Sequence, residues 1–132
     1  MKYLLDTHTF LWTVADIEKL SEKVTNIIEA PEHDIFVSAI SFWEISIKHR
    51  LGKLHLGKLN LHQLLNITEK MGFQTLPLTP HEALSQSSLR AGENKDPFDR
   101  MLVWQSIHNK VTLLSRDTRL HHFKPDGLKV VW

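Results

Sequence analysis

Five short apolar segments along the chain have the composition of β-strands. They are rich in Leu, Ile, Val and aromatic residues, and they lie at 2–5, 34–38, 73–78, 111–115 and 128–132. Their apolar positions are mostly continuous rather than strictly alternating, which is typical of strands that helices cover on both faces. We therefore predict a buried sheet of about five strands.

Helical spacing of apolar residues appears between most of these segments. It is visible in four stretches, at 24–28 after Ser21, at 42–51 after Ser41, at 61–68 and at 101–107. Strands that alternate with helices pair in parallel, so the sequence predicts a three-layer α/β/α fold with a central parallel sheet. No linker, low-complexity segment or internal repeat interrupts this pattern, and we expect one domain over residues 1–132.

The composition is that of an ordinary globular protein. The 132 residues are 42% hydrophobic and 23% charged, which excludes the disordered, collagen-like and low-complexity classes. There is no Cys, so a disulfide framework and a thiolate zinc site are excluded, and a reducing setting is favoured. No apolar run reaches the roughly 18 residues of a membrane span, so we expect a cytoplasmic protein without a membrane partner. The net charge of +1 neither favours nor excludes a polyanionic partner.

Carboxylates follow the predicted strands at the place where parallel sheets bind ligands, beyond the carboxyl ends of the strands. Asp6 directly follows the first segment, and Asp117 follows the fourth. Glu44 comes a few residues after the second, while Asp96 and Asp99 open the helix before the fourth. If the sheet closes as predicted, Asp6, Glu44, Asp99 and Asp117 converge on one rim.

Clustered carboxylates point to a cation and to phosphate chemistry. Several acids at close range stay ionised only if a positive charge neutralises them, and oxygen ligands suit Mg²⁺ or Mn²⁺. Such ions, alone or as a pair about 4 Å apart, deprotonate a water and stabilise charge on a phosphate under in-line attack. The pattern favours phosphodiester hydrolysis over glycoside hydrolysis, which needs only one acid pair and no metal.

Four motifs around these acids resemble the PIN-domain family, and most closely the VapC-like ribonuclease toxins of bacterial toxin-antitoxin pairs. The motifs are Leu4-Leu5-Asp6-Thr7-His8, residues 38–48 around Trp43-Glu44, Asp96-Pro97-Phe98-Asp99-Arg100, and Leu114-Ser115-Arg116-Asp117. They occur in the order and at the spacing of the family, and together they cover essentially the whole chain.

The resemblance implies RNA cleavage that depends on Mg²⁺ or Mn²⁺, a cognate antitoxin that blocks the site, and a homodimer. It carries the catalytic, metal-binding roles onto four acids, Asp6, Glu44, Asp99 and Asp117. Asp96 belongs to the Asp-Pro-Phe-Asp pattern of a subgroup. Ser115 matches a position where the family often places Ser or Thr beside the metal, and Thr7 is a further candidate.

Several of these residues also have an ordinary structural interpretation. Ser41 and Glu44 have the spacing of a capping box, and Asp96-Pro97 has that of an N-cap followed by Pro at the first helical position. Asp6 and Asp117 lie where turns begin. Four acids in the expected order nevertheless favour a site over four unrelated caps and turns.

Three cations near the acids are candidate ligands of the substrate phosphates. Lys48 lies four residues after Glu44, where it pairs with the acid or reaches a phosphate. Arg100 and Arg116 flank the other acids, where guanidinium groups suit phosphate oxygens and a solvated surface role is about as plausible. The basic, Leu-rich stretch at 48–65 has three interpretations, an RNA-facing arm, a groove for a partner helix, or a helix hairpin that packs on the core.

The leading hypothesis is therefore a metal-dependent endoribonuclease that acts as the toxin of a toxin-antitoxin pair. Two alternatives stay open, a PIN-like RNA-processing nuclease outside such a pair and a non-catalytic module that binds RNA or an antitoxin. A phosphate-receiving signalling domain is disfavoured, because it needs an acid pair after the first strand, where this chain has Asp6 and Thr7.

Overall fold

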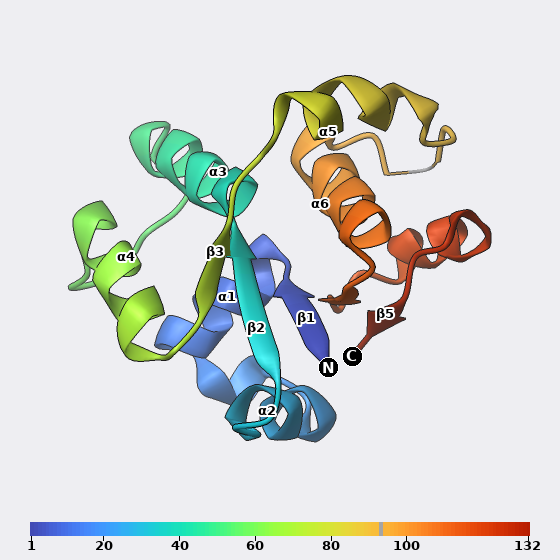
Figure 1. Cartoon of the computed structure of the whole chain (residues 1–132). Coiled ribbons are helices and arrows are strands. Elements are labelled where there is room, and N and C mark those ends of the chain that lie inside the picture. Colours follow the sequence, from blue (N-terminus) through green and yellow to red (C-terminus); the bar gives the residue numbers. More distant parts are fainter. Residues whose placement is uncertain (93) are drawn as a thin grey trace.

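A five-stranded, all-parallel sheet lies at the centre of the structure, a computed structural model that describes residues 1–92 and 94–132 (Figure 1). The strands are β1 (Lys2–Leu5), β2 (Asp34–Ser38), β3 (Gln74–Leu76), β4 (Thr112–Leu114) and β5 (Val130–Val131). Their order is β3-β2-β1-β4-β5. Each strand lies within a segment that the sequence predicts, so the parallel sheet is confirmed, although the last three strands are shorter than predicted.

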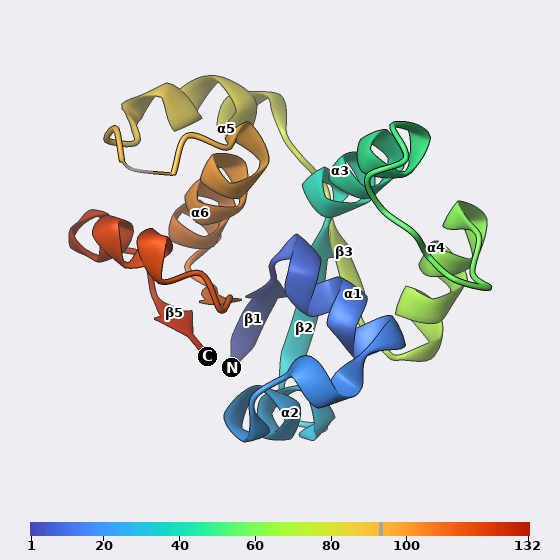
Figure 2. The ribbon, with the colours of Figure 1, turned by 180° about the vertical axis from the view of Figure 1, so that it is seen from behind.

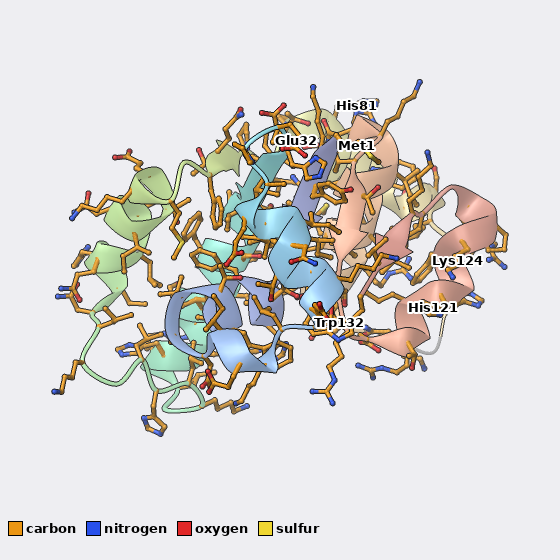
Figure 3. All side chains as sticks on the ribbon, turned by 90° about the horizontal axis from the view of Figure 1, so that it is seen from below. Met1, Glu32, His81, His121, Lys124 and Trp132 are labelled. Atoms are coloured by element: carbon orange, nitrogen blue, oxygen red, sulfur yellow. The ribbon has the colours of Figure 1, made fainter. Side chains whose placement is uncertain are left out.

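Helices cover both faces of this sheet and make the fold three-layered, as predicted. One face carries α1 (Thr7–Ala15), η1 (Ile17–Lys19), α2 (Glu22–Glu29) and α4 (Leu61–Lys70), and the other carries α5 (Pro80–Ser85), η2 (Gln86–Ser88), α6 (Pro97–Asn109) and η3 (Thr118–Asp126). Between them, α3 (Ala39–Arg50) contacts both α1 and α6. Figure 2 shows α1 in front of the sheet when the molecule is seen from behind. In Figure 3, α4 and η3 lie at opposite ends, with His121 and Lys124 marking η3.

The alternation of side chains along β1 divides the core into two layers. Tyr3 and Leu5 pack with Phe10 of α1, whereas Leu4 packs on the other side with Leu102 of α6. Burying each such side chain contributes roughly 1.5–3 kcal/mol. The two layers hold the carboxyl end of β1 between packed helices, and this end carries the candidate site.

The start of α3 differs from the sequence prediction. The helix begins at Ala39, and its N-cap is Ser38, whose hydroxyl accepts a hydrogen bond from the Ile40 N–H at 3.0 Å. The alternative interpretation of Ser41 and Glu44 as a capping box is therefore wrong. The earlier start places Ser41 and Glu44 inside the helix, three and six residues beyond the true cap, and both are buried.

The stretch at 48–65 joins α3 to α4 and lies against the core. Leu54, Leu56 and Leu61 pack on the cluster that contains Phe10 and Leu64. This contact agrees with the interpretation of the stretch as a helix hairpin on the core. None of the helices in the described part of the chain is long and apolar enough to span a membrane.

Candidate active site

The order of the strands places a crevice at the carboxyl ends of β1 and β4. The chain moves outward from β1 to β2 and β3 and then returns to β4 on the other side of β1. Ligands of open parallel sheets bind at such a switch point. Asp6 follows β1 there, and its N–H donates to the Leu114 carbonyl at the end of β4, at 3.2 Å. Asp117 lies three residues further along from Leu114, so two of the predicted acids flank the crevice.

Asp6 is both a helix cap and a buried acid. Its Oδ1 accepts the Thr9 N–H at 2.8 Å, which caps α1, and the residue is only 8% exposed. Burial raises the pKa of Asp6, although hydrogen bonds from Ser115 and Thr9 and the charge of His8 act in the opposite direction. The capping role therefore accounts for the position of Asp6, and a cap alone does not need a carboxylate held out of water.

Asn94 joins two of the other acids. Its Nδ2 lies 2.8 Å from Asp99 Oδ2 and 3.4 Å from Asp117 Oδ2, so it donates to both carboxylates. Its Oδ1 accepts the Asp96 N–H at 2.9 Å, and Asn94 itself is 3% exposed. Asn94 could not be predicted as a site residue, because its only signal in the sequence is its position two residues before Asp96, which matches no spacing rule.

Asp99 lies where the negative charges of the site add up. Its pKa is raised to about 6, first by burial and then by the charges of Asp96, Glu44 and Asp6, while the Asn94 hydrogen bond acts in the opposite direction. Asp117 behaves differently, because Arg119 binds it through both Nε and Nη2 at 3.0 and 2.9 Å and lowers its pKa. The acids around Asp99 thus share an excess of negative charge.

Glu44 is 2% exposed, and its hydrogen-bond and ion-pair partners lie on two helices, α1 and α3. Thr7 Oγ1 at the start of α1 donates to Glu44 Oε1 at 2.6 Å and also lies 3.0 Å from the Ser41 hydroxyl. Lys48, one turn later in α3, forms an ion pair with Glu44 Oε2. Burial lowers the pKa of Lys48, but the hydrogen bond with Glu44 and the charges of Glu44, Asp96 and Asp99 outweigh it, so the pKa lies above its ordinary value.

The remaining predicted residues have separate local roles. Asp96 caps α6 by accepting the Phe98 N–H at 2.8 Å, as its Asp-Pro spacing predicts. The Ser115 hydroxyl accepts the Asp117 N–H at 3.1 Å and so shapes the turn after β4.

Arg100 and Arg116, the two arginines predicted to contact phosphates, differ in their surroundings. Arg100 donates to the carbonyls of Leu89 and Arg90 at 3.0 and 2.9 Å, which fixes its guanidinium. Arg116 is exposed and lines a hollow of about 380 Å³ together with Asp6 and Asp117. Arg116 is therefore the better placed of the two for a ligand at the crevice.

The donor set fits a hard divalent cation. All the acids offer oxygen ligands, and burial together with mutual repulsion leaves negative charge that a cation relieves. As the side chains stand in residues 1–92 and 94–132, no three Asp, Glu or His groups are gathered around one point as ligands. Neighbouring donors occupy the carboxylates instead, above all Lys48 at Glu44 and Asn94 at Asp99.

Comparisons with known proteins agree with this geometry. The sequence matches the PIN domain over residues 3–124. It is 27% identical to Ribonuclease VapC22 of Mycobacterium tuberculosis over 129 residues, which are 98% of this chain and 97% of that protein.

Two solved structures have a similar fold. One is VapBC2 from Rickettsia felis bound to a DNA fragment from its promoter, with a TM-score of 0.70 at 17% identity over 99% of this chain and 98% of that one. The other is DNA-bound VapBC from Salmonella typhimurium, with a TM-score of 0.68 at 18% identity over 99% of this chain and 97% of that one. The predicted α/β/α fold is thus confirmed by relatives as well as by the sheet.

Proposed function

Because the chain belongs to the PIN domain family, we propose that it is a cytoplasmic endoribonuclease that depends on Mg²⁺ or Mn²⁺ and acts as the toxin of a toxin-antitoxin pair. The similarity to Ribonuclease VapC22 over nearly the full length of both chains supports the activity. The observation that carries the proposal is that Asp6, Asp99 and Asp117 lie together at the carboxyl ends of β1 and β4, where Asn94 bridges Asp99 and Asp117. The raised pKa of Asp99 agrees with this gathering of negative charge. Such a concentration of negative charge at a switch point favours a metal site.

Four acids would hold the ion, namely Asp6, Glu44, Asp99 and Asp117, with Asp96, Ser115 and Thr7 as additional candidates. A bound divalent cation supplies a Lewis acid for the phosphate and lowers the pKa of a coordinated water. Carboxylates of this kind bind the ion only in their ionised form, so Asp99 must lose its proton first. Asp99 is half ionised near pH 6, which leaves the site ready for a cation at neutral pH.

The chain's own cations prepare the site for a polyanion. Lys48 neutralises Glu44 while the site is free, and it lies close enough to Asp96 and Asp99 for their charges to raise its pKa. A cation bound by the carboxylates would leave Lys48 free to contact a substrate phosphate. Arg116 would contact the phosphate from the hollow that it lines together with Asp6 and Asp117. We assign Arg100 a weaker contact, because carbonyl groups hold its guanidinium.

We assign the antitoxin to the groove beside α1. A cavity of about 330 Å³ lies between α1 and the segment that precedes α4, and Leu11, Trp12, Leu54 and Leu56 line it. His8 and Trp12 line both this cavity and the hollow at Asp6, so the two are adjacent. An apolar segment bound there would reach the crevice and block it. A homodimer, as the family resemblance implies, completes the proposed assembly.

Cleavage of RNA by the purified, antitoxin-free protein tests this proposal. A pool of transfer, ribosomal and messenger RNA is incubated with Mg²⁺, Mn²⁺ or EDTA, beside a variant that carries Asp6→Asn and Asp99→Asn. Discrete cuts that need the metal and are absent in the variant support a nuclease. Binding of RNA without metal-dependent cuts by an intact fold would leave only a binding module. Cuts without a neighbouring antitoxin gene would favour an RNA-processing nuclease outside a toxin-antitoxin pair.

A further inference from the structure

A groove with aromatic and basic lining residues lies near the acidic cluster, the name used here for Asp6, Glu44, Asp99 and Asp117. It measures about 400 Å³ and lies between the first turns of α3 and α6, with Trp43, Pro97, Phe98 and Met101 among its walls. Because α3 follows β2 and α6 leads into β4, both helices begin at the carboxyl end of the sheet, on either side of it in Figure 1. The groove therefore opens at the same end of the molecule as the crevice.

Trp43 is the feature that distinguishes this groove. It is 57% exposed, and the other three tryptophans of the chain are less exposed. Its ring packs edge-to-face on Phe98, with centroids 5.3 Å apart and an interplanar angle of 77°. The core does not hold this large apolar ring, but Phe98 fixes its orientation, so one broad surface is presented to solvent in a defined position.

Trp43 and Phe98 are each adjacent in sequence to an acid of the candidate site. Trp43 directly precedes Glu44, and Phe98 lies between Asp96 and Asp99. Consecutive residues of a helix project about 100° apart, so Trp43 and Phe98 lie on the helix faces next to those that carry Glu44 and Asp99. A base that stacks on Trp43 therefore lies on the flank of the acidic cluster. Among the Phe, Trp and Tyr rings of the described residues, Trp43 is the exposed one, while His8 and the half-buried Trp12 line the hollow at Asp6 and Asp117.

The charges of the groove match a nucleic acid strand. Lys95 and Arg100 line it, and none of its lining residues in the described part of the chain is acidic. The acidic cluster itself repels a phosphate backbone until a cation is bound. A strand is therefore attracted to the molecule first on the groove side, where two positive charges accompany the aromatic pair.

We infer that Trp43, supported by Phe98, is a stacking platform for an unpaired base of the RNA next to the phosphate that is cut, with Lys95 at the adjoining phosphate. Stacking on an aromatic ring requires a base that has left its helix, so this platform selects single-stranded segments and loops over duplex RNA. The inference deepens the proposed ribonuclease function and rests on it for the place of the cut, while the binding contact is independent of catalysis.

The test compares the wild-type protein with Trp43→Leu and Trp43→Phe. Ile17→Ala is the matched control, because Ile17 is similarly exposed, at 53%, but lies on η1. The dissociation constant of a labelled, unstructured oligoribonucleotide is measured in EDTA, and KM and kcat are measured with Mn²⁺. Trp43→Leu should raise Kd and KM about 10-fold, Trp43→Phe should raise them less, and Ile17→Ala should leave them unchanged.

A set of oligoribonucleotides with one abasic nucleotide at each position around the cut locates the contact. At one position next to the cut, removing the base should weaken binding to the wild type and leave binding to Trp43→Leu unchanged, since the two changes remove the same contact. The same sequence placed in a duplex should bind the wild type and Trp43→Leu equally.

Each other outcome overturns a separate part of the account. If the wild type cleaves RNA but Trp43→Leu keeps its Kd and KM, the platform is refuted and the nuclease stands. If Trp43→Leu binds RNA normally and loses only its affinity for an antitoxin, the groove belongs to a protein partner. If binding depends on Trp43 but no metal gives cleavage, the platform stands and the proposed nuclease activity falls.

Discussion

Lys48 forms an ion pair with Glu44 one turn earlier in α3, and the side chain of Glu44 is 3% exposed whereas that of Lys48 is 34% exposed. Glu44, the buried partner, is one of the predicted metal ligands. Its counter-ion Lys48 has access to water. This asymmetry suits a cation that is exchanged, because Lys48 can move to solvent while Glu44 keeps its hydrogen bond from Thr7.

Removing the counter-ion should destabilise the free protein and increase its stabilisation by metal. In Lys48→Met, Glu44 loses its ion-pair partner, which costs about 1 to 2 kcal/mol and lowers Tm in EDTA by several degrees. Added Mn²⁺ should raise Tm by more than it does in the wild type. Thermal unfolding with and without Mn²⁺ measures both effects. Lys19→Met, which removes an exposed pair with Asp16, is the control and should change neither.

The stability of the metal-free protein should fall as the pH rises from about 4 to 6. The pKa of Asp99 is about 6 in the folded protein, against an ordinary value of 3.8. Between these two pH values the folded state therefore binds more protons than the unfolded state. Burial of Asp6 acts in the same direction. The loss is at most about 3 kcal/mol for Asp99. Asp117, whose pKa is lowered, affects stability only below its ordinary range.

Denaturant unfolding in EDTA at several pH values measures this dependence. Asp99→Asn should remove most of the fall and leave the variant more stable than the wild type at pH 7. A wild-type stability that rises between pH 4 and 6 would contradict the charge arrangement described for Asp99.

Asn94 should control the ionisation of Asp99. The hydrogen bond from Asn94 lowers the pKa of Asp99, so Asn94→Ala should raise that pKa above 6 and shift the pH dependence of metal binding upward. Carbon NMR of the Asp99 carboxyl group across a pH series gives the value directly. Asn109→Ala, which removes a similar hydrogen bond to Glu82 on α5, is the comparison and should leave Asp99 unaffected.

Two substitutions of Asp6 separate its roles as cap and as ligand. Asn caps helices as well as Asp does, so Asp6→Asn should keep the fold, gain stability in EDTA and lose metal-dependent cleavage. Asp6→Ala also removes the hydrogen bond to the Thr9 N–H and should be less stable than Asp6→Asn by about 1 kcal/mol. Equal cleavage by Asp6→Asn and the wild type would show that Asp6 is only a cap.

The sheet could be predicted from sequence because each strand is a short apolar run between polar segments. Helix α1 could not, because Thr7, Thr9 and Thr13 interrupt its apolar spacing and β-branched residues disfavour helices. Tertiary contacts decide the outcome, since Thr9 Oγ1 donates to the Leu114 carbonyl and Phe10 is fully buried. Helix α5 has too few residues to show a helical apolar period, although Thr79 and Glu82 form a capping box around Pro80.

The candidate acids could be named from the sequence, because Asp6 and Asp117 follow strands and Asp99 opens the helix before β4. Their hydrogen-bond partners could not be predicted. Asn94 donates across gaps of 5 and 23 residues, to Asp99 and Asp117, and Thr7 reaches Glu44 across 37 residues. No local spacing encodes such contacts, because they depend on how α1, α3 and α6 meet. Asp6 caps α1 and also lines the crevice, so a capping interpretation does not exclude a site interpretation.

The most direct test of the central claim is the rate of cleavage of one unstructured oligoribonucleotide as a function of Mn²⁺ concentration at pH 7. The wild type should show a rate that saturates with Mn²⁺ and vanishes in EDTA, and Asp6→Asn should stay at background at every concentration despite an intact fold. Cleavage that persists in EDTA, or that Asp6→Asn performs as fast as the wild type, would contradict the assignment of these carboxylates to a metal-dependent ribonuclease site.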